Sequence, residues 1–215
     1  MSDADLAMYK RRLRQEMLAR LASFSDVRAT AGRALAAGLT RSESWRRADR
    51  LALFMSRRDE IDTTPLLERA FEARRPVLLP RMADESVLEF VVVPDLGGLQ
   101  PGRFGILEPS REAPTSELMA GDLVLVPGLA FDAQGGRLGR GVGYYDRVFA
   151  RYPNAHEGPI RIGVGFCFQL IERVPMADHD VRMDGFASES GTILFGPSGL
   201  GDARSMKRDG RSDGE

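Results

Sequence analysis

The sequence contains few of the residue types that form disulfides and transition-metal sites. Its 215 residues include one cysteine, Cys167, and two histidines, so an intrachain disulfide is impossible and a metal site built from several His or Cys ligands is excluded. Cys167 lies between Phe166 and Phe168, which predicts a buried and inert thiol. His179 precedes Asp180, but one His-Asp pair does not define a metal site, and we assign His179 no role.

Long apolar runs and an excess of one charge are also missing. Runs such as LVLVP are only long enough for a strand, and the N-terminus lacks the uninterrupted apolar core of a signal peptide. The net charge is −1 with both signs interspersed, which gives no electrostatic reason to expect binding to nucleic acid or to a membrane. We therefore expect a cytoplasmic, monomeric protein whose partners are small molecules.

Lysine is scarce as well, occurring only at Lys10 and Lys207, so the abundance of arginine by itself identifies no site. Lys10 lies in helical register with the apolar Leu13 and Met17, and Arg14 follows one turn later. A solvated helix face is the ordinary explanation for such cations. A lysine inside an apolar stripe needs a reason, however, and we expect Lys10 and Arg14 to face a ligand.

What is present is an alternation of strand-like and helix-like segments. It predicts an α/β fold: a single-domain layered sandwich with a central, largely parallel sheet flanked by helices, whose sites lie beyond the carboxyl ends of strands. The domain is expected over 1–197, and 198–215 form a polar tail that we expect to be disordered. We expect the loop over 94–120, which contains GILEP, to cover or border a site. The expected helices span 3–39, a segment through 66–71 and 144–152, and the expected strands are 51–55, 76–82, 87–93, 122–128, 161–166 and 191–196.

The run RLGRGVGYYDR is the clearest candidate for a binding site. Gly139, Gly141 and Gly143 alternate in it, and residues without a β-carbon let backbone amides approach an anion closely and adopt positive φ. Arg137 and Arg140 add positive charge, and the helix that follows adds its N-terminal dipole. The run therefore predicts a cradle for a polyphosphate, with a plain strand-to-helix turn as the alternative. It is not a P-loop, because no GK[ST] follows.

Asp146 follows the last glycine by three residues. From there its carboxylate is placed to reach a Mg2+ held between phosphate oxygens. The alternative is a solvated aspartate in the first turn of a helix, where it would complement the dipole.

LGRGVGYYDR closely resembles the signature of the 5-formyltetrahydrofolate cyclo-ligase family. Five further segments agree with that family in order, and the resemblance covers 10–189. They are KRRLR at 10–14, MSRRDEID at 55–62, VLLPRM at 77–82, PGLAFDAQGGRLGRG at 127–141 and HDVRMD at 179–184.

The resemblance implies an α/β sandwich that converts 5-formyltetrahydrofolate to 5,10-methenyltetrahydrofolate with hydrolysis of ATP, using Mg2+. It further implies that Asp146 and Asp180 hold the metal. The implied catalytic groups are Lys10, Arg14, Arg140 and Tyr144. The implied ATP contacts are Lys10, Arg11, Arg12, Leu13, Arg14, Arg137, Leu138, Gly139, Arg140, Gly141, Val142, Gly143, Tyr144 and Tyr145. The implied folate contacts are Met55, Glu60, Arg140, Gly141, Val142, Gly143 and Tyr144.

Several alternatives stay open at this point. Glu60 orients the pterin or accepts a proton from N10, unless it only caps a helix, and Met55 is either a contact or ordinary core. Val142 stands where the family pattern suggests glycine or a polar residue, and a β-branched residue disfavours positive φ. A sugar-phosphate isomerase or CoA-transferase on a similar scaffold and a non-catalytic folate- or nucleotide-binding regulator are the competing functions.

Overall fold

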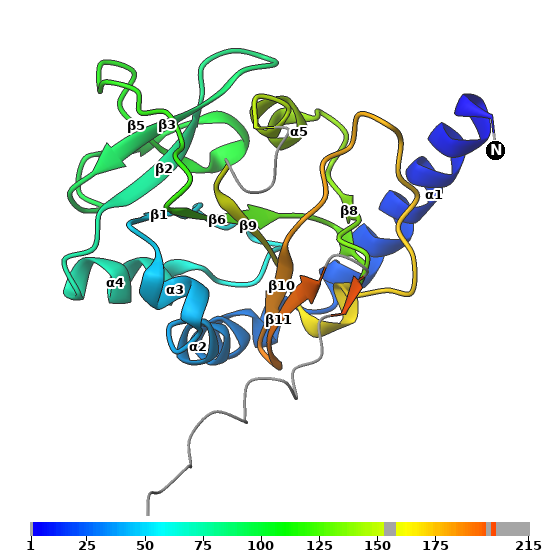
Figure 1. The fold of residues 1–215 in the computed structure, drawn as a ribbon, viewed down its shortest axis with the longest axis horizontal. Coiled ribbons are helices and arrows are strands. Elements are labelled where there is room, and N and C mark those ends of the chain that lie inside the picture. The colour runs from blue at the N-terminus through cyan, green and yellow to red at the C-terminus, as the bar shows by residue number, and fades with distance from the viewer. Residues whose placement is uncertain (1, 153–157, 197–198, 201–215) are drawn as a thin grey trace, which may run out of the picture.

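A computed structural model describes residues 2–152, 158–196 and 199–200, and its centre is one large mixed sheet (Figure 1). From one edge to the other the strands are β12 (Gly199–Leu200), β11 (Gly191–Gly196), β10 (Gly185–Ser188), β9 (Ile160–Val164), β6 (Asp122–Pro127), β1 (Arg50–Ala52), β2 (Val77–Met82) and β3 (Leu88–Val93). The strands from β10 to β2 run parallel to one another, whereas β3 on one side and β11 and β12 on the other are antiparallel to their neighbours. The predicted largely parallel α/β sheet is thus confirmed.

Helices lie on both faces of this sheet, and short elements fill the connections. None of the described helices is long and apolar enough to cross a membrane. The helices are α1 (Asp3–Ala22), η1 (Ser25–Val27), α2 (Arg28–Leu39), α3 (Glu43–Arg47), α4 (Thr64–Glu72), η2 (Arg103–Gly105), α5 (Tyr144–Phe149) and η3 (Cys167–Gln169). Two small ribbons pair β4 (Leu99–Pro101) with β5 (Leu107–Pro109) and β7 (Ala130–Phe131) with β8 (Arg137–Leu138).

Alternating side chains of the central strands separate two core layers. Leu51 and Leu53 pack with the buried faces of α2 and α4, whereas Ala52 points to the opposite layer, which contains α5. In that second layer Phe131 is fully buried, and a β-carbon on Gly163 would lie 2.4 Å from its ring. Near-continuous apolar strands are what a sheet covered on both faces requires.

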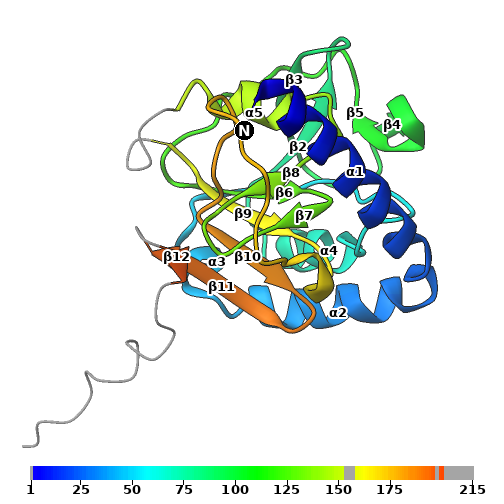
Figure 2. The ribbon, with the colours of Figure 1, turned by 90° about the vertical axis from the view of Figure 1, so that its right-hand side faces the viewer.

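The first helix closes one side of the molecule. In Figures 1 and 2, α1 runs beside the sheet from the level of α5 down to α2. Leu13, Met17 and Leu21 anchor it in the core layer of α2 and α4. A Ser2 capping box fixes its start, with Asp5 as the reciprocal partner. The predicted apolar stripe of this helix is thus confirmed, and its first turns extend beyond the sheet.

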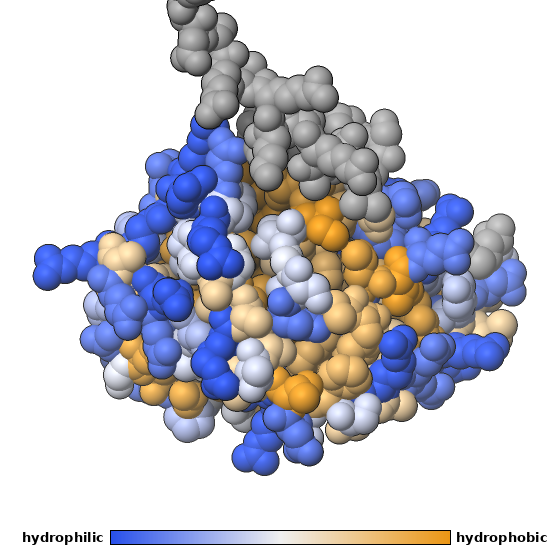
Figure 3. All heavy atoms as spheres, turned by 90° about the horizontal axis from the view of Figure 1, so that it is seen from below, coloured by the Kyte–Doolittle hydropathy of each residue, from blue (hydrophilic) through white to orange (hydrophobic). Residues whose placement is uncertain are grey.

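The molecular surface can be viewed from the side on which α2 lies. Figure 3 shows apolar residues gathered in the middle of this face with hydrophilic residues on either side of them.

Two expected elements differ from the observed ones, and one strand of the central sheet was not expected. The strand expected over 51–55 pairs only over Arg50–Ala52, after which the chain leaves the ladder toward the carboxyl edge. The helix expected over 144–152 ends at Phe149, where i→i+3 bonds tighten the chain. Strand β10 was not predicted, because its four small and mixed residues show no local period. The tail over 198–215 falls outside the described residues apart from β12, so its disorder stays a prediction.

The prediction for Cys167 was wrong about burial. Cys167 opens η3 at the surface, and its backbone N–H donates to the Glu189 carboxylate. A hydrogen bond between the thiol itself and the Glu189 carboxylate raises the pKa of the thiol, which disfavours the reactive thiolate. The flanking Phe166 and Phe168 instead form an aromatic cluster with Phe24.

Two glycines of α2 provide a matched test of the packing. A β-carbon on Gly32 would lie 2.3 Å from the Asp62 carbonyl oxygen, whereas one on Gly38 meets nothing within 4 Å. Gly32→Ala should lower the free energy of unfolding by about 1–3 kcal/mol through overpacking. Gly38→Ala should raise it by about 0.5–1 kcal/mol through the better helix propensity of alanine. Urea denaturation of both variants is the measurement, and equal shifts would contradict the close approach of α2 to the 57–62 turn.

Candidate functional site

A large cavity of about 980 Å³ opens beyond the carboxyl ends of β1, β2 and β6. Its walls come from six separate segments: the start of α1, the turn after β1, the β2–β5 region, the end of β6, the glycine loop with α5, and residues 177–180. The volume is at the upper end of the range for small-molecule sites, roughly 300–1000 Å³. A cavity therefore lies where a site is expected in a parallel sheet, and part of the 94–120 loop borders this cavity.

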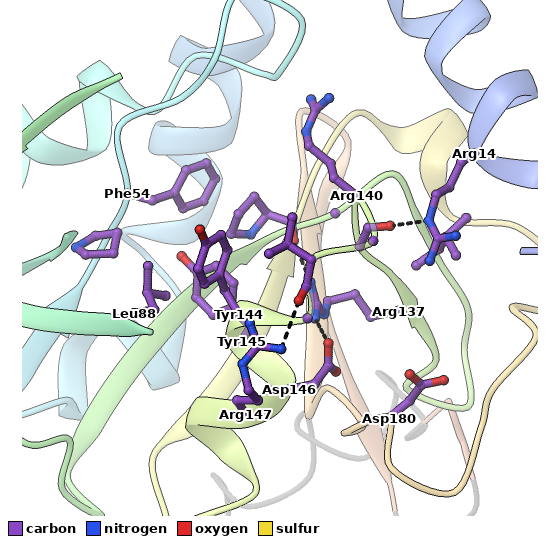
Figure 4. Close-up of a pocket in the computed structure, with 18 of the residues that line it drawn as sticks. Arg14, Phe54, Leu88, Arg137, Arg140, Tyr144, Tyr145, Asp146, Arg147 and Asp180 are labelled. Carbon is purple, nitrogen blue, oxygen red and sulfur yellow. Dashed lines mark hydrogen bonds and ion pairs between the residues drawn. The ribbon is translucent and has the colours of Figure 1, made fainter. Parts of the chain in front are cut away.

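One part of the cavity is apolar. Phe54 and Met55 come from the segment after β1, Leu88 begins β3, and Tyr144 begins α5. Figure 4 shows Phe54, Leu88 and Tyr144 on the same side of the opening. Phe104 contributes from η2, where it adopts a φ of 58°. Such a wall suits a flat aromatic ring system, which gains from stacking and from removal of apolar area from water.

Glu60 is buried at the edge of this apolar part, 8% exposed. Its Oε2 accepts from the Arg57 backbone N–H at 2.9 Å, and its Oε1 accepts from the Arg140 guanidinium at 3.1 Å. Arg28 donates to the Glu60 backbone carbonyl at 2.8 Å and so fixes the turn from the side of α2. Burial raises the pKa of the carboxyl, and the bonds to Arg57 and Arg140 offset part of that rise.

The glycine loop follows the β7–β8 ribbon and leads into α5, in the predicted order of strand, loop and helix. Gly141 and Gly143 adopt φ values of 109° and 78°, which L-residues disfavour, whereas Gly139 does not. Val142 is outside the positive-φ region and is 43% exposed, so valine fits there without strain. The Arg14 Nε donates to the Gly139 carbonyl at 2.9 Å, which ties α1 to the loop.

The turn before the loop is braced from within. Asp132 is 2% exposed and accepts hydrogen bonds from the backbone N–H groups of Gln134, Gly136 and Val174 at 2.7–2.9 Å. Because it joins the FDAQGG turn to the segment after η3, this carboxylate has a structural role that explains the aspartate in PGLAFD.

Two ion pairs form the charged part of the cavity. Arg137 donates to Asp146 at 2.8 Å, with the arginine side chain only 5% exposed (Figure 4). Lys10 contacts the Asp180 carboxylate across a separation of 170 positions. Asp180 is held by the Ala177 backbone N–H at 2.6 Å. Cations for phosphate and carboxylates for a hard metal ion therefore occupy one wall.

Mg2+ fits this donor set. It favours hard oxygen ligands and is bound in enzymes by one or two carboxylates together with substrate phosphates. Asp146 and Asp180 both line the cavity, and two carboxylates are enough when substrate phosphates complete the coordination of Mg2+. Within residues 2–152, 158–196 and 199–200, no cluster of three or more His, Cys, Asp or Glu side chains provides a complete metal cage.

Most of the residues predicted from sequence line this one cavity, and three do not. Arg11 and Arg12 point to solvent from α1, and Leu13 is buried in the core. Their roles in ATP binding stay predictions. The predicted residues on the cavity wall are Lys10, Arg14, Met55, Glu60, Arg137, Leu138, Gly139, Arg140, Gly141, Val142, Gly143, Tyr144, Tyr145, Asp146 and Asp180.

Several lining residues were not predicted. The GILEP segment brings Glu108 to the cavity, with its Oε2 accepting from the Met82 backbone N–H at 3.2 Å. Arg147 lines the opening and donates to the carbonyls of Val142 and Ser86. The placement of GILEP in a loop expected to border the site was the available signal for Glu108. Apolar lining residues such as Phe54 cannot be told from core by sequence pattern.

Comparisons with known proteins identify relatives over most of the chain. The sequence model described as the 5-formyltetrahydrofolate cyclo-ligase family matches residues 7–188. A Caenorhabditis elegans protein named probable 5-formyltetrahydrofolate cyclo-ligase is 31% identical over 163 residues, covering 72% of this chain and 79% of that protein. The Saccharomyces cerevisiae 5-formyltetrahydrofolate cyclo-ligase is 32% identical over 165 residues, covering 67% and 77% respectively.

A solved structure extends the likeness to the fold. The NMR structure of Aquifex aeolicus 5,10-methenyltetrahydrofolate synthetase matches with a TM-score of 0.74 and 28% identity, covering 96% of each chain. A Mycoplasma pneumoniae 5,10-methenyltetrahydrofolate synthetase has the same fold, with a TM-score of 0.64, 19% identity and coverage of 84% of this chain and 98% of that one.

The burial of Glu60 predicts a pH dependence of stability. Its pKa in the folded protein is raised above the ordinary value of 4.5, so the unfolded chain ionises first as the pH rises. The stability of the wild-type protein relative to Glu60→Gln should therefore be greatest near pH 4 and fall as the pH rises above that value. Urea denaturation of both proteins over a series of pH values measures the difference. A difference that stays constant or grows with pH would show that the ion pair with Arg140, rather than burial, dominates.

Proposed function

The chain belongs to the 5-formyltetrahydrofolate cyclo-ligase family, as its motifs predicted, and is an enzyme of that kind; we propose that it couples closure of 5-formyltetrahydrofolate to 5,10-methenyltetrahydrofolate with the conversion of ATP to ADP and phosphate. The formyl amide is a poor electrophile, and its oxygen cannot leave as hydroxide. Transfer of a phosphoryl group to that oxygen removes both obstacles.

One observation carries this proposal: the apolar and the charged parts belong to a single cavity. Tyr144 and Glu60 border the part that suits a pterin, and Lys10, Arg137 and Asp146 border the part that suits a metal-bound triphosphate. A transfer between two substrates requires both to be held side by side with the reacting atoms in contact. The Gly139–Gly143 loop lies where the two parts meet.

In the first step, the formyl oxygen attacks the γ-phosphorus and ADP leaves, which gives an iminium phosphate on N5. The protein's contribution is positioning and neutralisation of negative charge, as in other phosphoryl transfers. Lys10, Arg14 and Arg137 provide the cations. Mg2+, held by Asp146 and Asp180, would supply further neutralisation of the phosphate oxygens when bound.

In the second step, N10 of the folate attacks the activated carbon, loses its proton, and phosphate departs with the former formyl oxygen. Glu60, fixed by the Arg57 backbone N–H, is placed to orient the pterin through hydrogen bonds. Tyr144 lines the same part of the cavity and provides a ring for stacking. Burial raises the pKa of the Tyr145 phenol, which keeps Tyr145 neutral and suits it to packing rather than proton transfer.

The direct test is to mix the protein with 5-formyltetrahydrofolate, ATP and Mg2+ and to follow the absorbance of methenyltetrahydrofolate together with ADP release. We expect both products in equal amounts, and neither when ATP or Mg2+ is left out. Binding of both ligands without turnover would favour a regulator. Turnover of a sugar phosphate or an acyl-CoA without folate chemistry would favour the competing enzymes.

Lys10 is expected to contribute to the use of ATP. Removing its charge in Lys10→Ala takes away a cation on the phosphate side of the cavity, and kcat/KM for ATP should fall on the order of 10²-fold. Steady-state kinetics at saturating folate provide the measurement. Arg47→Ala is the control, because Arg47 is 80% exposed in α3 and its ion pair among the described residues is with Glu43. An unchanged value for Lys10→Ala would remove Lys10 from the phosphate site.

A further inference from the structure

Asp59 occupies an unusual place beside the cavity. It is not part of the cavity wall, yet it contacts two arginines that are. Both carboxylate oxygens of Asp59 accept from the Nη2 of Arg140 at 2.9 Å, and its Oδ1 lies 3.6 Å from the Nε of Arg57. The side chain is one-third exposed, at 33%, so it faces the outside of the turn rather than the ligand space.

Arg140 depends on this contact for its direction. Arg140 lies in the loop between Gly139 and Gly141. Neither neighbour has a β-carbon, so the backbone on either side of Arg140 is less restricted than it would be beside other residues. The hydrogen bonds that the structure gives its guanidinium go to Asp59 and to Glu60. Figure 4 shows Arg140 directed away from Arg137 and Asp146, the charged part of the cavity.

The two acceptors of Arg140 have different positions. Glu60 is buried on the cavity wall, where its carboxylate is available to a bound ligand, and Asp59 is outside it. The Nη2 of Arg140 donates to both carboxylates and its Nε donates to Glu60, so charge-assisted hydrogen bonds to two neighbouring residues hold the guanidinium. Without Asp59, the Glu60 carboxylate would be the remaining anchor for a side chain on a glycine-rich loop.

We propose that Asp59 is a positioning residue for the folate half of the site: by holding Arg140 against Glu60, it fixes the carboxylate that receives the pterin, while leaving the phosphate half untouched. This inference rests on the proposed function. It assigns Asp59 no contact with substrate and makes Arg140 the intermediate through which Asp59 acts. It also places Arg140 on the folate side of the reacting atoms.

The proposal predicts that loss of the Asp59 charge affects the binding of the two substrates differently. Asp59→Asn keeps the size of the side chain and removes its charge, so the Nη2 of Arg140 loses one of its two carboxylate partners. The dissociation constant for 5-formyltetrahydrofolate should rise about tenfold, and that for ATP should stay within about twofold. Asp59→Glu retains a carboxylate and should recover part of the loss.

A double-mutant cycle with Arg140→Gln tests whether Asp59 acts through Arg140. Isothermal titration of 5-formyltetrahydrofolate without ATP measures binding with no turnover, and KM for each substrate is measured alongside. If the proposal holds, Asp59→Asn weakens folate binding in the wild-type background and adds nothing in the Arg140→Gln background. Glu43→Gln, which removes a carboxylate from an exposed i,i+4 pair in α3, is the control.

Three results would overturn the proposal. They are no change in folate binding by Asp59→Asn, equal losses for folate and ATP together with a lower melting temperature, and additive losses in the cycle. The wild-type assay separates this from a failure of the proposed function: wild-type turnover with an unaffected Asp59→Asn refutes the positioning role alone. A wild-type protein that neither binds nor converts 5-formyltetrahydrofolate refutes the function itself, and the positioning role with it.

Discussion

The contact between Lys10 and Asp180 closes the cavity, since it joins the first helix to a segment 170 positions away. The other walls are joined in the same way, by Arg14 to the Gly139 carbonyl, by Arg137 to Asp146 and by Arg140 to the Asp59–Glu60 turn. Partly buried pairs of this kind pay a desolvation cost that nearly cancels their attraction, so they specify geometry more than they add stability. The shape of the cavity therefore depends on charge pairing between segments that are far apart in sequence.

This pairing bears directly on how the proposed substrates enter. A buried cation or carboxylate left without a partner is strongly unfavourable, so a ligand that removed only one member of each pair would bind poorly. ATP with Mg2+ carries both signs. The phosphates are suited to Lys10 and Arg137, and the metal ion to Asp146 and Asp180, so each group that gives up its present partner gains another. An anion without a metal ion would leave the carboxylates without compensation.

Sequence pattern predicts those parts of the structure that local chemistry determines. The sheet strands β2, β3, β6, β9 and β11 follow from short apolar runs, and the glycine run predicts its own loop, because Gly141 and Gly143 do adopt positive φ. Gly139 is not among the positive-φ glycines, and a β-carbon there would approach the Arg137 guanidinium at 3.0 Å. The pairing of β10 and the ribbon of β7 and β8 depend on contacts with other segments of the chain. No alternating apolar pattern in their own sequence predicts them.

The candidate site shows the same division. Sequence motifs predicted four charged residues of the cavity wall: Lys10, Glu60, Asp146 and Asp180. The motifs do not predict which cation contacts which carboxylate, because those pairs form only in the tertiary fold. Cys167 illustrates the limit, since two phenylalanine neighbours predicted burial and the rings instead pack on Phe24 while the thiol stays outside.

Glu60 shows what the arrangement costs and what it provides. An ionisable group that is 8% exposed, with its pKa raised by burial, is a poor choice for stability, and glutamine would fill the same space without a charge. A carboxylate, however, accepts hydrogen bonds from N–H donors more strongly than an amide does. It also has no N–H group of its own, whereas the amide of glutamine could rotate and place its NH2 group where the acceptor oxygen is needed. Arg140 and the Arg57 backbone N–H lower the cost by stabilising the ionised form. The 57–60 turn thus holds a carboxyl group in an apolar place, an arrangement in which functional sites are enriched.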